Sequence, residues 1–154
     1  MRVVLHDPFD TTEDDMTQLH GMTTMVLTAD DVDAAAAWYA DAFGITPYFR
    51  RPESGPAAYV EFRVGPDEDE LGLMSRAYAP AGSDGPGSSI TYWHVDDVAS
   101  ALGDLLALGA REHSPTTERG GGFTTASVVD PFGNVLGLMH SPHWAGRHAG
   151  PATD

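Results

Sequence analysis

The side chains in this sequence that could do chemistry are histidines, tyrosines and carboxylates. The sequence contains no cysteine. That absence excludes thiolate metal sites, disulfides and a cysteine nucleophile. Among the histidines, His94 follows Tyr92 by two residues in a predicted strand, which places both side chains on one face. An imidazole and a phenol there could bond a ligand or transfer protons. The alternative is a strand-end histidine bonded to backbone or water.

The sequence gives little support for other kinds of catalytic site, for nucleic-acid binding or for membrane association. The chain has no Ser-His-Asp spacing, phosphate loop or HExxH phrase. Its formal net charge of -15, with 8 arginines and no lysine, argues against a phosphate-binding surface, so we expect no nucleic acid partner. No apolar run approaches the roughly 20 residues that cross a bilayer, so we expect no membrane partner and a soluble, cytoplasmic protein.

A four-residue phrase occurs twice and indicates that the fold is duplicated. Leu71-Gly72-Leu73-Met74 returns 65 residues later as Leu136-Gly137-Leu138-Met139. Asp30-Asp31-Val32 likewise returns as Asp96-Asp97-Val98, in the same order and at an offset of 66. Two copies of one supersecondary unit are therefore predicted.

The elements that position these residues repeat in the same order. An Asp-capped helix over 32–43, ended by Gly44, and a second helix beginning at Val98 and closed by Gly109 each follow one strand and precede three. We predict an α+β fold of two tandem βαβββ modules. The strands are predicted at 22–28, 45–51, 57–64, 70–76, 89–95, 110–117, 123–129 and 134–140. We expect the chain to divide into an N-terminal arm (1–21), a first module (22–77), a linker (78–88), a second module (89–140) and a C-terminal tail (141–154). In the tail, only Trp144 should pack against the rest of the protein.

Two βαβββ units, an Asp-capped helix ending in Tyr39 to Gly44, and an Asp-Pro-x-Gly-Asn turn (130–134) resemble the vicinal oxygen chelate superfamily. This is the fold of glyoxalases, extradiol dioxygenases and bleomycin-binding resistance proteins. The resemblance covers about 22–140 and implies that the modules form a cupped mixed sheet with the helices on its outer face. It also implies a homodimer whose pockets are completed across the interface, with the arm packing on the partner. It implies much less about function, because one scaffold hosts several chemistries and pure binders.

The resemblance also implies where a metal would be bound. Metal-dependent members carry His, Gln or Glu on the first and last strand of each unit, at positions that correspond here to Thr24, Gly72, Ile90 and Gly137. None of these is a usual ligand. We therefore expect no metal and no cofactor.

The glycines admit two compatible interpretations: a bend or close backbone approach in the sheet, or open volume for an organic ligand in the cup. Met74 and Met139 share their face and could line an adaptable pocket. The predicted ligand-binding residues are Thr24, Gly72, Met74, Ile90, Tyr92, His94, Gly137 and Met139, with His94 and Tyr92 as the catalytic candidates.

The leading hypothesis is a metal-independent small-molecule binding protein of the bleomycin-resistance type that sequesters an antibiotic or other natural product. One alternative is a metal-free lyase, isomerase or cyclase that uses His94 or Tyr92 as acid or base. Another is a metal enzyme with unmapped ligands.

Overall fold

Each half of the chain folds into one βαβββ module in a computed structural model that describes residues 17–82 and 89–150. The first 16 residues, which make up most of the predicted arm, lie outside the described residues, as do 83–88 of the predicted linker and 151–154 of the tail.

The first module contains β1 (Thr24–Ala29), α1 (Val32–Phe43), β2 (Pro47–Arg51), β3 (Tyr59–Val64) and β4 (Asp69–Ser75), followed by the 3-10 turn η2 (Arg76–Tyr78). Its strands have the order β1-β4-β3-β2, with β1 parallel to β4. The Asp31 carboxylate accepts a hydrogen bond from the backbone N–H of Ala34, and Gly44 has a left-handed conformation. These two local signals fix the ends of α1 where the sequence predicts them.

The second module repeats this plan with β5 (Tyr92–His94), α2 (Val98–Ala107), β6 (Arg111–Gly120), β7 (Phe123–Val129) and β8 (Val135–His140). The strand order is β5-β8-β7-β6, and β5 is parallel to β8. Asp97 caps α2 as Asp31 caps α1. The predicted duplication and the α+β fold class are therefore confirmed. The first strand is shorter than predicted, since β5 covers three residues instead of 89–95.

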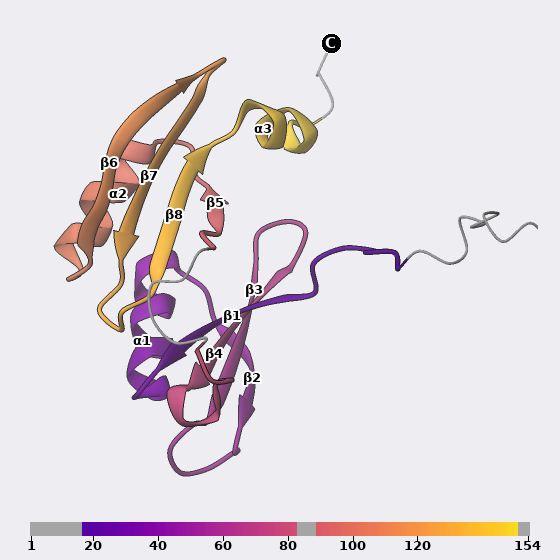
Figure 1. Cartoon of the computed structure of the whole chain (residues 1–154), viewed down its shortest axis with the longest axis vertical. Helices are drawn as coiled ribbons and strands as arrows, with labels where there is room; N and C mark the ends of the chain where they lie inside the picture. The colour runs from indigo at the N-terminus through magenta and orange to yellow at the C-terminus, as the bar shows by residue number, and fades with distance from the viewer. Residues whose placement is uncertain (1–16, 83–88, 151–154) are drawn as a thin grey trace, which may run out of the picture.

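Each module buries its own apolar cluster between helix and sheet. Figure 1 shows α1 and α2 on the same side of the molecule, each over its own sheet. Val60, Phe62, Leu71 and Leu73 face α1, and the corresponding residues of β7 and β8 face α2. Trp38 packs against both clusters, and its Nε1–H donates to the Leu108 carbonyl at 2.8 Å. This side chain thus joins the two cores.

The predicted Asp-Pro-x-Gly-Asn turn fastens the second module to the first. The Asn134 side chain accepts from the backbone N–H of Thr28 at 3.2 Å and donates to the Thr28 carbonyl at 2.9 Å. Buried Asp130 accepts the Tyr39 hydroxyl at 2.6 Å. Burial first, and then the Asp130 carboxylate, raises the pKa of Tyr39 well above its ordinary value, so the phenol remains a donor. The side chains of the turn therefore hold the two modules together.

The tail differs from the sequence prediction because it forms a helix, α3 (Pro142–His148). Ser141 caps the helix by accepting from the Trp144 backbone N–H, and Pro142 occupies its first turn. Trp144 does pack, as predicted, but His148 packs beside it and reaches Asp67 in the β3–β4 turn at 2.8 Å. Among the described residues, no helix is long and apolar enough to cross a membrane.

Candidate functional site

The face of each sheet that is turned away from its helix, called the cup face below, holds most of the predicted site residues. In the first module the register places Val26, Gly72 and Glu61 side by side on neighbouring strands. Residues two positions away along a strand share a face, so Thr24 and Met74 also lie there. Thr24 itself pairs with Glu70, and its hydroxyl donates to that carboxylate at 2.7 Å. The residue opposite Gly72 is thus Val26, two positions after the predicted Thr24.

A tyrosine ring occupies the space above Gly72. A Cβ added to this glycine would lie 2.8 Å from Cζ of Tyr59 and 2.9 Å from its Cε2, inside van der Waals contact. Tyr59 comes from β3, where it pairs with Met74, and its ring leans back over the glycine. The expectation of open volume at Gly72 is therefore wrong. The alternative, a glycine required by close approach, describes the structure.

The same face carries a carboxylate bonded by two phenols. Glu61 accepts the hydroxyls of both Tyr48 and Tyr59. Burial raises the pKa of Tyr59, and the bond to Glu61 raises it further; for Tyr48 the bond to Glu61 is the leading cause of a raised pKa. Both phenols therefore keep their protons and remain donors. The Arg63 guanidinium lies over the Tyr48 ring, with Cζ 4.2 Å from the centroid. The sequence analysis did not identify this cluster.

The second module repeats the tyrosine-covered glycine with a different strand. Tyr92 of β5 pairs directly with Gly137 of β8. A Cβ added to Gly137 would lie 2.6 Å from Cδ1 of Tyr92 and 2.8 Å from the Thr91 carbonyl oxygen. Tyr92 thus lies on the predicted face, but it fills the volume that a ligand was expected to use. Met139 lies beside it on the same face.

Polar pairs extend the cup face of the second module toward its outer strand. Ser127, which pairs with Gly137, is almost fully buried, and its hydroxyl lies 2.8 Å from Nδ1 of His113. Arg119 Nε donates to the Thr125 hydroxyl at 2.9 Å. Both pairs link β6 to β7.

His94 does not face an open cup. The backbone N–H of Ser141 donates to its Nδ1 at 3.1 Å, and its ring stacks on Trp144 with centroids 4.3 Å apart. The side chain is 8% exposed, and Nε2 is buried 3.8 Å from an Asp96 oxygen. Burial, followed by the neighbouring His140, lowers the pKa of His94, which favours the neutral ring. The backbone-bonded alternative describes this histidine, because α3 covers it.

The residues at the four family positions do not fit a metal ion. Thr24 is already bonded to Glu70, and Ile90 lies before β5 with 39% of its surface exposed. The glycines supply no ligand atom, and tyrosine rings cover both of them. Within the described ranges 17–82 and 89–150, no group of three or more histidines and carboxylates could hold a metal. The donor set required for this family's metal site is therefore missing from these positions.

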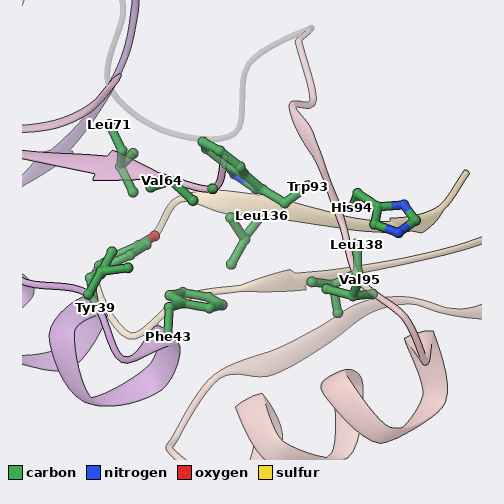
Figure 2. Close-up of a pocket in the computed structure, with 11 residues that line it drawn as sticks. Tyr39, Phe43, Val64, Leu71, Trp93, His94, Val95, Leu136 and Leu138 are labelled. Atoms are coloured by element: carbon green, nitrogen blue, oxygen red, sulfur yellow. The ribbon is translucent and has the colours of Figure 1, made fainter. Parts of the chain in front are cut away.

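A cavity of about 240 Å³ lies away from the cup faces, at the seam between the two modules. Figure 2 shows Tyr39 and Phe43 of α1 on one side and Trp93, Leu136 and Leu138 of the second module on the other. Of the eight predicted ligand-binding residues, only His94 lines it, and Figure 2 places that imidazole at the end far from Tyr39. The cavity and the predicted site are thus different places.

Comparison with known proteins agrees with the duplicated fold. The family model described as Glyoxalase/Bleomycin resistance protein/Dioxygenase superfamily matches residues 21–138. A search of curated proteins gives no match. TioX from Micromonospora sp. ML1 superposes with a TM-score of 0.62 at 19% identity, over 78% of this chain and 98% of that one.

Two further solved structures superpose equally well. A glyoxalase-related enzyme from Fulvimarina pelagi gives a TM-score of 0.64 at 23% identity, over 80% of this chain and 90% of that one. A lactoylglutathione lyase from Agrobacterium tumefaciens gives 0.61 at 23% identity, over 83% and 98%. At these identities the structures show the fold alone, while the family match covers most of the chain. The chain therefore belongs to the glyoxalase/bleomycin resistance protein/dioxygenase superfamily.

Proposed function

We propose that this protein is a metal-independent small-molecule binding protein of the bleomycin-resistance type, which sequesters an antibiotic or other natural product on its cup faces. The observation that carries the proposal is the pair of tyrosine-covered glycines. At Gly72 and Gly137, where the family resemblance implies metal ligands, the rings of Tyr59 and Tyr92 are found instead. Aromatic surface suits stacking of a planar organic ligand.

The Glu61 cluster gives the ligand a chemical character. Each carboxylate oxygen already accepts one phenol hydroxyl, and a carboxylate has about four acceptor sites, so further donors can be accommodated. Glu70 lies on the same face, two residues from Gly72. Carboxylates beside aromatic rings favour a ligand with N–H donors and positive charge. The net charge of -15 acts in the same direction at longer range.

We further propose that the protein is a homodimer in which a second copy covers the cup faces. Val26 on β1 is 41% exposed and Tyr92 on β5 is 40% exposed, and both strands lie at an edge of their sheet that a second copy could cover. Phe49 and Tyr48 at the outer strand of the first module are also exposed. Apolar surface of this kind on two faces is typical of an interaction site. The pocket would then be closed by ligand and partner together.

A metal-free isomerase, lyase or cyclase is the second candidate, and one observation favours it. Two phenols that share one carboxylate, Tyr48 and Tyr59 with Glu61, form a hydrogen-bonded chain through which a proton can be passed. Tyr92 remains an exposed phenol on the other module. His94 is less suited to this role, because α3 covers its ring.

Calorimetric titration in the presence of EDTA separates these candidates. The probes are metal-free bleomycin, a cationic natural product, and S-lactoylglutathione. We expect bleomycin to bind and to be recovered unchanged, and Glu61→Gln to weaken its binding about tenfold, because a charge-assisted bond is worth roughly 1.5 kcal/mol. The matched control is Glu118→Gln on β6, an exposed carboxylate outside the cluster.

Three results would contradict the binder proposal. One is binding that appears only after a divalent metal is added. Another is an affinity for bleomycin that Glu61→Gln and Glu118→Gln leave equally unchanged. The third is repeated turnover of S-lactoylglutathione that Tyr92→Phe or Tyr59→Phe abolishes, which would favour the enzyme.

A further inference from the structure

We propose that the seam cavity is a second binding site, separate from the cup faces, for an uncharged apolar molecule such as a small aromatic compound. The cavity is built by both modules. Tyr39 and Phe43 of α1 and Leu71 of β4 form one side, and Trp93, Leu136 and Leu138 form the other (Figure 2). The proposal does not depend on the function proposed for the cup faces.

The chemistry of the walls defines the class of ligand. No charged side chain lines the cavity, apart from the titratable ring of His94 at its end. The Tyr39 hydroxyl is already bonded to Asp130, and two buried ring nitrogens of the lining residues, Trp93 Nε1 and His94 Nε2, have no hydrogen-bond partner among the described residues. A charged or strongly polar guest would therefore lose its hydrogen bonds to water and regain at most the two that these nitrogens offer. An apolar guest loses nothing of this kind and gains dispersion contacts on both sides.

The size of the cavity limits the guest. Its volume of about 240 Å³ exceeds the roughly 30 Å³ that one water molecule occupies in the liquid, so the cavity can hold a small molecule. An engineered apolar cavity of roughly 150 Å³ in another protein binds benzene. Scaling from that case gives a guest of roughly ten non-hydrogen atoms. One wall reaches the surface, since Phe43 lines the cavity and is 38% exposed, and this defines a route of entry.

Because the cavity lies between the two modules, a bound ligand should stabilise their packing against each other. Leu71 of the first module and Leu136 of the second belong to different core clusters, and the guest would contact both. A molecule that fills the seam therefore adds contacts between the modules beyond those of Trp38 and the turn at 130–134. Because it binds only the folded arrangement, it should raise the unfolding temperature of the whole chain.

The test uses toluene as the apolar probe and benzoate as its charged counterpart, with the full chain. Val64→Phe adds a ring at the cavity wall, and Val26→Phe makes the same change on the cup face. We expect toluene to raise the unfolding temperature of the wild type and of Val26→Phe. In Val64→Phe its affinity should fall at least tenfold. Benzoate should have no effect on any of them.

Methyl NMR on the wild-type protein keeps the test decisive if Val64→Phe fails to fold. Toluene is then expected to shift the methyl signals of Leu136, Leu138 and Val64, and to leave those of Val26 and Met74 in place. The proposal is overturned if toluene does not bind, if Val26→Phe removes binding while Val64→Phe retains it, or if benzoate binds as well as toluene. Shifts confined to the cup-face methyls would overturn it equally.

Discussion

Replacing Gly72 with alanine should reveal the ring of Tyr59 above it. The added Cβ would lie 2.8 Å from Cζ and 2.9 Å from Cε2 of Tyr59, so the ring has to move and its bond to Glu61 is disturbed. Overpacking of this kind costs about 1–3 kcal/mol. Alanine in a strand recovers about 0.5–1 kcal/mol of backbone entropy relative to glycine. We expect a net loss of up to about 2.5 kcal/mol in the free energy of unfolding.

A double-mutant cycle isolates the contact. In a Tyr59→Ala background the ring is gone, so Gly72→Ala should stabilise the protein by about 0.5–1 kcal/mol. The coupling free energy between the two positions then equals the cost of the clash, about 1–3 kcal/mol. Urea unfolding of the four proteins measures it. Gly103→Ala in α2 is the control: nothing lies near the added Cβ, so it should stabilise both backgrounds equally.

The second glycine should behave differently. A Cβ on Gly137 meets the Thr91 carbonyl oxygen at 2.8 Å as well as the Tyr92 ring, and a backbone oxygen cannot rotate away. Tyr92→Ala should therefore rescue Gly137→Ala only in part. Additive effects at Gly72 and Tyr59, within about 0.5 kcal/mol, would refute the reasoning, because contacting residues must couple. Full rescue at Gly137 would refute the role of Thr91.

Three further perturbations test the joints between the modules. Tyr39→Phe removes the hydroxyl that donates to buried Asp130 and should lower the free energy of unfolding by about 1.5–3 kcal/mol. The control Tyr78→Phe, on the surface, should change it very little. Equal losses for the two variants in urea unfolding would contradict this expectation. Asn134→Ala removes both bonds to the Thr28 backbone, so hydrogen exchange at the Thr28 amide should accelerate, and unchanged protection would contradict the bond. His148 Nδ1 lies 2.8 Å from the Trp144 carbonyl and Nε2 lies 2.8 Å from Asp67, so only the protonated ring can donate to both, and these contacts raise its pKa. The stability that His148 contributes is therefore fully present below its unfolded pKa of about 6.5, and it is lost as the pH rises through the folded pKa. In an NMR titration, Asp67→Asn should lower the pH midpoint of the His148 ring. An unchanged midpoint would count against the His148–Asp67 pair.

Most of the fold could be predicted because its signals are local and occur twice. Asp31 and Gly44 act within a turn of the helix ends that they define, so α1 is found where the sequence predicts it. The tail helix was missed although it carries a signal of the same kind. Ser141 followed by Pro142 is a helix start, but the prolines and glycines around it favour an irregular tail.

The candidate site was harder to predict because it depends on neighbours that are distant in sequence. The sequence shows that Gly72 lacks a side chain, but not that Tyr59 on another strand leans over it. A signal for the correct face was present: apolar Val60 and Phe62 alternate with Tyr59 and Glu61, and the apolar set must face the helix. That alternation places Glu61 beside Gly72 once β3 is paired with β4.

His94 shows the limit of strand alternation as a guide. Alternation correctly groups it with Tyr92, since β5 pairs both residues with the cup-face residues of β8. It says nothing about which segment lies over the end of the strand. The ring of Trp144, 50 residues later in the chain, stacks on His94, and the Ser141 backbone bonds it. Whether the His94 ring is exposed could therefore be learned only from the tertiary structure.

The central claim is that an organic ligand binds at the tyrosine-covered glycines without a metal. Two methionines allow a direct measurement, since Met74 and Met139 lie on the cup faces while Met25 packs on the helix side. With methyl-labelled methionine and metal-free bleomycin in EDTA, we predict that the signals of Met74 and Met139 shift and that of Met25 does not. Shifts that appear only after a divalent metal is added, or a shift confined to Met25, would contradict the account.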